Sequence, residues 1–219
     1  MSLSVPNKTM SVFKGWDNHM QILEENWNKL VSPEDTVVLM GDSSWAMRID
    51  DAVEDFAFID NLHGKKLILK GNHDYWWTSM QKMNDFFEKN SFSTLNILHM
   101  NHYQYENYGI CGSRGWVNME GEAHDEKVLK REAMRLEASI KSAVSANLKP
   151  LVFLHYPPVF QSACSYEILD VLYKYNITEC YYAHIHGYAC KNAITGMSDN
   201  INFTMLSSDY LQFVPKQIL

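Results

Sequence analysis

Four short polar motifs each follow an apolar stretch of the chain. In order, they are Gly41-Asp42, Gly71-Asn72-His73-Asp74, His155 and His184-Ile185-His186. The runs that precede them are TVVLM, KKLILK, PLVFL and ITECYYA, which are typical of buried strands. Because the carboxyl ends of parallel strands meet at one edge of an α/β sheet, we expect these polar side chains to converge there, outside the packed core.

The polar residues of these motifs share one kind of chemistry. Asp42 offers a carboxylate, Asn72 offers a carboxamide, and imidazoles come from His155, His184 and His186. Oxygen and neutral nitrogen donors suit borderline divalent metals such as Zn, Mn or Fe. Taken alone, each residue has an ordinary structural explanation, for example as a turn residue or a hydrogen-bonded core histidine. Taken together and in this order, they predict a metal-dependent hydrolase with divalent metal ions as cofactors.

The composition sets the size of the fold and excludes some partners. At 219 residues, of which 46% are hydrophobic, the chain is long enough for one well-buried domain, which we expect to span residues 1–219. A formal net charge of -7 argues against non-specific binding to nucleic acid or to an anionic membrane. A small phosphate ester is still an acceptable substrate, because bound metal ions neutralise its charge.

Cysteine usage and the first residues indicate a cytoplasmic protein. The four cysteines form no C-x-x-C pair and are expected to be reduced packing residues. The opening string MSLSVPNKTM contains no apolar signal segment, and no apolar run approaches the length of a membrane span. We therefore expect a soluble, cytoplasmic protein without a membrane partner.

Hydrophobic periodicity predicts alternating helices and strands. Apolar residues at helical spacing predict helices around residues 20–30, 50–62, 78–89, 129–144 and 165–175. Apolar or β-branched runs predict strands at 36–41, 65–70, 93–99, 107–112, 150–154, 177–183, 201–207 and 210–214. This alternation, with an antiparallel pair at the end, indicates an α/β fold with mixed sheets in layers.

With these motifs the chain resembles the calcineurin-like metallophosphoesterases over nearly its whole length. The longer strings GDSSWAM, GNHDYWW, CGSRGW, LHYPP and SSDYL are similar to one bacterial subgroup of predicted phosphohydrolases. The resemblance implies a four-layer α/β/β/α sandwich with two metal ions, both bridged by Asp42. The residues that complete one metal site would be Asn72, His155 and His184, and His186 would belong to the other site.

The resemblance also implies a reaction, which is hydrolysis of phosphate mono- or diesters by a metal-activated hydroxide. His73 would protonate the leaving oxygen or bind the phosphate. Asp74 would hold the His73 ring in the required tautomer. Arg114 in the CGSRGW string has two explanations of similar weight, a contact with phosphate or a structural role.

One block of the family is absent from this sequence. The family begins with D-x-H at the end of its first strand, which supplies an Asp and a His to the site that His186 joins. Here these letters occur as Asp17-Asn18-His19, within the predicted first helix. The first strand is therefore expected to be missing, through a late start assignment, a trimmed sequence or a genuine loss. The alternative function is a truncated or inactive metal- or phosphate-binding module with one intact metal site.

Overall fold

The computed structural model describes residues 1–5, 7–117, 125–161 and 163–219. They form two units, each with its own sheet and helices: one contains Met1–Ile97 and Ser208–Leu219, and the other contains Leu98–Ser207. Parallel and antiparallel strand pairs occur together, so the mixed α/β fold expected of a metallophosphoesterase is confirmed. The assignment of residues 1–219 to a single domain stays a prediction.

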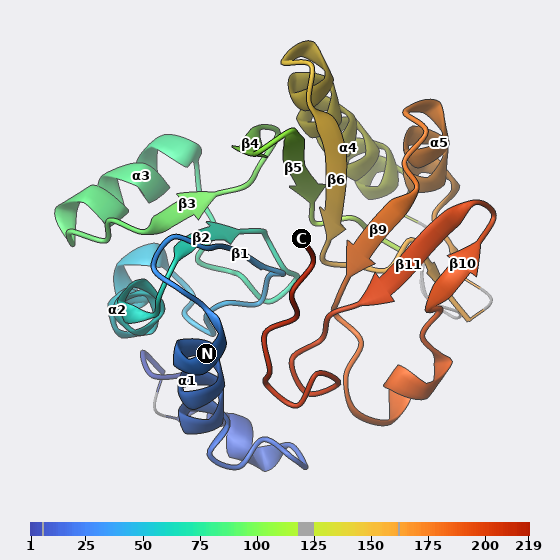
Figure 1. Cartoon of the computed structure of the whole chain (residues 1–219). Helices are drawn as coiled ribbons and strands as arrows, with labels where there is room; N and C mark the ends of the chain where they lie inside the picture. The colour runs from blue at the N-terminus through green and yellow to red at the C-terminus, as the bar shows by residue number, and fades with distance from the viewer. Residues whose placement is uncertain (6, 118–124, 162) are drawn as a thin grey trace. The chain divides into compact units, whose positions relative to one another are not determined.

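The first unit is built on a three-stranded parallel sheet in the order β1-β2-β3 (Figure 1). Its strands are β1 (Thr36–Leu39), β2 (Lys65–Ile68) and β3 (Leu95–Ile97). Its helices are α1 (His19–Leu30), α2 (Val53–Asn61) and α3 (Met80–Lys89), with 3-10 turns η1 (Met10–Val12) and η2 (Ile49–Asp51). Because the strands are parallel, β1 and β2 deliver their following motifs to the same edge of this sheet.

Apolar faces explain why these helices form and where they pack. On α3, Met83, Phe86 and Phe87 are buried at spacings of three and four residues, which places them on one face of the helix. Ser79 caps this helix by accepting a hydrogen bond from the backbone N–H of Lys82. The α2 residue Phe56 is fully buried and contributes about 1.5–3 kcal/mol of hydrophobic stabilisation to this core.

The second unit is built on a six-stranded mixed sheet in the order β10-β11-β9-β6-β5-β4. Its strands are β4 (His102–Tyr105), β5 (Tyr108–Ser113), β6 (Lys149–Leu154), β9 (Glu179–Tyr182), β10 (Gly196–Ser198) and β11 (Ile201–Met205). The central strands β11, β9, β6 and β5 are parallel, whereas β10 and β4 are antiparallel to their neighbours. A separate short hairpin pairs β7 (Val159–Phe160) with β8 (Ala163–Cys164).

Two helices pack side by side against this sheet, α4 (Glu126–Ser145) and α5 (Tyr166–Lys174) (Figure 1). The apolar stripe of α4 supplies Leu136 and Ile140, both fully buried in the core of the unit. Gly109 lets β5 approach α4 closely, since a Cβ there would lie 2.4 Å from the Cβ of Ala143. A 3-10 turn, η3, follows at Gly187–Asn192. None of the helices in the described ranges is long and apolar enough to cross a lipid bilayer.

The prediction of a strand at residues 210–214 is wrong. Those residues form turns and irregular structure, and Gln212 and Phe213 have positive φ angles of 54° and 57°, which a strand does not allow. The strand before them, β11, pairs with β9 on one side and with β10 on the other, so neither of its edges is open. The predicted strand 93–99 is shortened to β3, and the apolar patterns miss β4, β7, β8 and β10.

Candidate metal and phosphate site

In the first unit, Asp42 follows β1 in an unusual backbone conformation. Its φ angle of 55° lies in the left-handed region, which L-residues rarely adopt. Its Oδ1 atom accepts a hydrogen bond of 2.8 Å from the backbone N–H of His73. Gly71 makes this approach possible, since a Cβ at that position would lie 1.9 Å from Asp42 Oδ1. The motifs that follow β1 and β2 therefore meet, as the sequence predicts.

Asp74 is the acceptor that joins these two motifs. Its buried carboxylate accepts hydrogen bonds from the backbone N–H groups of Gly71 (2.6 Å), Asp42 (2.8 Å), Ser43 (2.8 Å) and Ser44 (3.4 Å), and from Trp76 Nε1 (2.8 Å). Burial, followed by the charge of Asp42, raises the pKa of Asp74 to about 6. Since all five partners are donors, they favour the ionised carboxylate, and Asp74 is charged at neutral pH.

The expected contact between Asp74 and the His73 ring is wrong. His73 Nδ1 is buried without a hydrogen-bond partner in the described part of the chain. Trp45 stacks on the imidazole instead, with ring centroids 5.1 Å apart and an interplanar angle of 24°. Tyr75 meets the ring edge-on at 6.1 Å. Aromatic contacts therefore orient His73. The tryptophan of the GDSSWAM string is Trp45, and this role was not predicted from the sequence.

In the second unit, His155 and His184 follow the adjacent parallel strands β6 and β9. His155 is buried, and its Nε2 lies 3.2 Å from Nδ1 of the half-buried His184. Two nitrogens that each bind one cation at about 2.0–2.1 Å are separated by about 2.9–3.4 Å at tetrahedral or octahedral angles. The spacing and the neutral donors therefore fit a shared divalent cation, and the sequence prediction that these two histidines meet is confirmed.

Aromatic packing holds this pair, and one of its members has a strained backbone. The rings of Tyr156 and His184 have centroids 4.0 Å apart, and Tyr156 also meets His155 edge-on at 5.3 Å. His184 has a φ angle of 70°, a second candidate ligand in the left-handed region. Tyr156 was not predicted as a site residue, although it directly follows His155 in the LHYPP string.

The two remaining predicted ligands lie in different surroundings. Asn72 is half-buried in the first unit between Gly71 and His73. His186 is exposed in the second unit, at the residue that precedes the 3-10 turn η3. Metal binding by Asn72 and His186 stays a prediction.

The letters D-x-H lie at the start of a helix and not after a strand. Asn18 is the N-cap of α1 and His19 is its first residue, so only the last of the three belongs to the helix itself. His19 Nδ1 bonds to the carbonyl oxygen of Trp16 at 2.9 Å, and its ring packs against Trp16 and Phe213. Burial lowers the pKa of His19. This histidine is therefore part of an aromatic packing cluster.

Comparisons with known proteins bear on the identity of this fold. A sequence profile described as calcineurin-like phosphoesterase matches residues 14–188. Among solved structures, TT1561 of Thermus thermophilus is similar with a TM-score of 0.54 and 14% identity, over 78% of each chain. A protein of unknown function, AQ665 from Aquifex aeolicus, gives a TM-score of 0.49 and 18% identity, over 93% of this chain and 81% of that one. No curated protein matches the sequence.

The profile covers most of the chain and contains every motif that the sequence singled out up to His186. The likeness to TT1561 extends over the same mixed α/β fold. The chain therefore belongs to the calcineurin-like phosphoesterase family.

Proposed function

We propose that this chain is a metal-dependent phosphohydrolase that cleaves phosphate mono- or diesters of small molecules in the cytoplasm. The observation that carries the proposal is the pair of imidazole nitrogens of His155 and His184, 3.2 Å apart after two adjacent parallel strands. Neutral nitrogen donors at this separation suit Mn, Fe or Zn. Membership of the family supports metal-dependent cleavage of phosphoesters in general.

Asp42 and Asn72 would also act as metal ligands, and His186 would serve a second ion. Bound divalent ions would supply a Lewis acid and an activated water at neutral pH. Asn72 would contribute a neutral oxygen. Because this ligand adds no negative charge to the metal site, it would repel an incoming phosphate less than a carboxylate would. The N–H of His73 holds the Asp42 carboxylate in place at 2.8 Å.

His73 would act as the general acid. Its ring is fixed between Trp45 and Tyr75, so a ring nitrogen can be aimed at the substrate without a carboxylate partner. The proton would pass from this nitrogen to the leaving oxygen of the ester, which departs as an alcohol. Asp74 would act as a positioning residue, because it fixes the backbone of the loop that carries Asp42.

The test combines metal content with turnover of p-nitrophenyl phosphate and bis(p-nitrophenyl) phosphate, in protein supplied with Mn, Zn or Fe. His155→Ala and His184→Ala should each lower metal content and turnover together. His73→Ala should keep the metal and lower turnover by ~10²–10⁴-fold, as is usual for a lost general acid. The exposed His63 provides a control, since His63→Ala should change neither quantity. Unchanged metal content in both the His155 and the His184 variant would refute the proposal.

A second candidate is a metal- or phosphate-binding module with one intact metal site. The placement of Asp17-Asn18-His19 at the start of α1, packed into an aromatic cluster, favours it. In the same experiment, this candidate predicts about one bound metal ion per chain and turnover no faster than that of His73→Ala. Two bound ions with turnover that depends on His73 would exclude it.

A further inference from the structure

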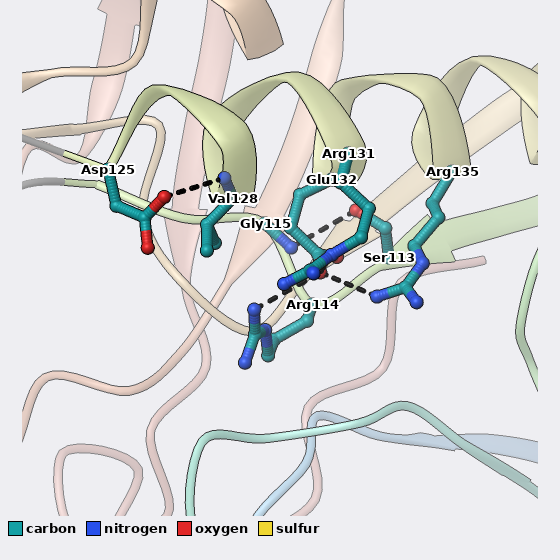
Figure 2. A network of polar contacts seen from close by, with 8 residues as sticks. All are labelled: Ser113, Arg114, Gly115, Asp125, Val128, Arg131, Glu132 and Arg135. Atoms are coloured by element: carbon teal, nitrogen blue, oxygen red, sulfur yellow. Dashed lines mark hydrogen bonds and ion pairs between the residues drawn. The ribbon is translucent and has the colours of Figure 1, made fainter.

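Three arginines surround one buried carboxylate in the second unit (Figure 2). Glu132 of α4 is 1% exposed, and its Oε1 lies 2.7 Å from Arg135 Nη1, 3.1 Å from Arg114 Nη2 and 3.9 Å from Arg131 Nε. Arg131 and Arg135 project from the same helix, and Arg114 comes from the loop after β5. We call these four residues the arginine cluster.

The charges of the arginine cluster do not balance. Among the residues that the structure describes, one carboxylate faces three guanidinium groups, which leaves a local excess of positive charge in a chain whose net charge is -7. One arginine would be enough to neutralise Glu132, and a guanidinium is always charged. Arg114 is only 14% exposed, and its buried Nε has no acceptor among the described residues. Such an excess of positive charge, with one buried donor that lacks an acceptor, favours an additional anion.

The loop that carries Arg114 has a fixed geometry. Ser113 Oγ accepts a hydrogen bond of 3.1 Å from the N–H of Gly115, and Gly115 has a positive φ of 65°. The Cζ atom of Arg114 lies 4.9 Å from the centroid of the Trp116 ring, within the range of a cation–π contact. Glu132 and Trp116 therefore hold the guanidinium from two directions before any ligand arrives.

Arg114 stands at the same sheet edge as the histidine pair. It follows β5, whose neighbour β6 leads to His155, and the carbonyl of Arg114 accepts a hydrogen bond of 2.9 Å from the N–H of Tyr156. Ring contacts continue from Arg114 to the histidines, because Trp116 lies 4.9 Å from Tyr156, which lies 4.0 Å from His184. The arginine cluster and the histidine pair are thus neighbouring but distinct sites of one rim.

We infer that the arginine cluster binds a second phosphate of the substrate, while the phosphoryl group that is cleaved lies at the histidine pair. The inference rests on the proposed function and adds a substrate class to it, namely small phosphate esters that carry a further phosphate. Arg114 supplies a guanidinium that is already held in place, and the exposed Arg131 and the half-buried Arg135 supply the other two charges. Glu132 is a positioning residue for all three.

Binding of tripolyphosphate to protein freed of metal with a chelator, measured by calorimetry after dialysis, tests the inference. The variant Arg131→Gln/Arg135→Gln changes two residues that are not at the histidine pair, and it should weaken binding at least about tenfold, because it removes two charged hydrogen-bond donors. The matched control, Lys127→Gln/Lys141→Gln, removes the same charge from exposed positions of the same helix and should stay within about twofold of wild type. Thermal melts verify that both variants fold, and Arg114→Gln provides a second, independent variant.

The outcomes separate a failure of this inference from a failure of the proposed function. Equal weakening in both double variants, or no binding to the wild-type protein, would overturn the inference, because the cluster would then be a structural ion pair only. Arginine-dependent binding in a protein without phosphoesterase turnover would keep the anion site and refute the proposed function. Turnover without arginine-dependent binding would keep the proposed function and refute the anion site. In active protein, Arg131→Gln/Arg135→Gln should raise KM for fructose 1,6-bisphosphate more than KM for fructose 6-phosphate. An equal rise in both KM values would also contradict the inference.

Discussion

Replacing Trp45 by leucine tests whether aromatic stacking, and not a carboxylate, orients His73. The two rings lie 5.1 Å apart at 24°, within the range of offset-stacked pairs, which contribute about 0.5–1.5 kcal/mol beyond their burial. Leucine keeps an apolar side chain but removes the ring, so the stacked orientation should lose that free energy. The fraction of productive His73 rings, and with it kcat, should fall about 2- to 12-fold.

Phenylalanine at the same position separates the stack from the other contacts of Trp45. Its indole Nε1 donates to Met10 Sδ at 3.0 Å, and Lys8 Nζ lies 5.5 Å from its ring centroid. Trp45→Phe removes the first of these contacts but keeps a ring over His73, so it should restore most of the kcat that Trp45→Leu loses. KM and metal content should stay constant in both variants, because Trp45 is not proposed to touch the substrate or the metal.

Nuclear magnetic resonance of the metal-free protein gives a readout that does not depend on turnover. A stacked indole shifts the ring protons of His73 upfield, and the His73→Ala variant identifies those signals by their loss. Trp45→Leu should move them toward the position of a free histidine. If both the signals and kcat of Trp45→Leu match those of wild type, the stack does not orient His73, and our account of this residue is refuted.

Three further predictions test other parts of the structure. Gly71→Ala should lower both metal content and turnover, the latter by roughly 10²-fold, because its Cβ would lie 1.9 Å from Asp42 Oδ1. Lys66 is fully buried, and desolvation lowers its pKa from 10.5 to about 8, so the unfolded chain binds more protons than the folded one between those pH values. The unfolding free energy of wild type, measured with urea, should therefore rise from about pH 8 to 10.5 relative to that of Lys66→Met. Glu132→Gln should lower the unfolding free energy by about 3 kcal/mol, because it leaves three guanidinium groups without their shared carboxylate.

The strands that carry the site were predictable because they are buried. The runs before Asp42, Gly71, His155 and His184 are apolar, and each forms a strand that ends one to three residues before its motif. In contrast, β4 (HYQY) and β10 (GMS) are the outermost strands of their sheet, with half-exposed or exposed residues and no apolar run. Their pairing is decided by the neighbouring strand and not by their own sequence.

The order of motifs predicts which residues meet but not which atoms bind. His73 and Asp74 are adjacent in sequence, which suggested a ring held by a carboxylate. In the folded unit, five N–H donors compete for the same two oxygens of Asp74, and four of them belong to the backbone. Backbone donors are invisible in a sequence, because every residue except proline carries one. The role of Trp45 is likewise not predictable from the sequence, because only the folded loop places its ring over His73.

Backbone strain at two candidate ligands connects the fold to the proposed chemistry. Asp42 and His184 both have positive φ angles, at 55° and 70°, and such conformations cost about 1–3 kcal/mol when the residue is not glycine. Glycine at either position would remove the cost but also the donor atom, so the strain is the consequence of placing a ligand where the chain turns sharply after a strand. Asp74 offsets it for Asp42, since it binds the N–H of that residue at 2.8 Å, and the ring of Tyr156 offsets it for His184. The residues that fix these two turns, Asp74 and Tyr156, should therefore be as sensitive to substitution as the proposed ligands themselves.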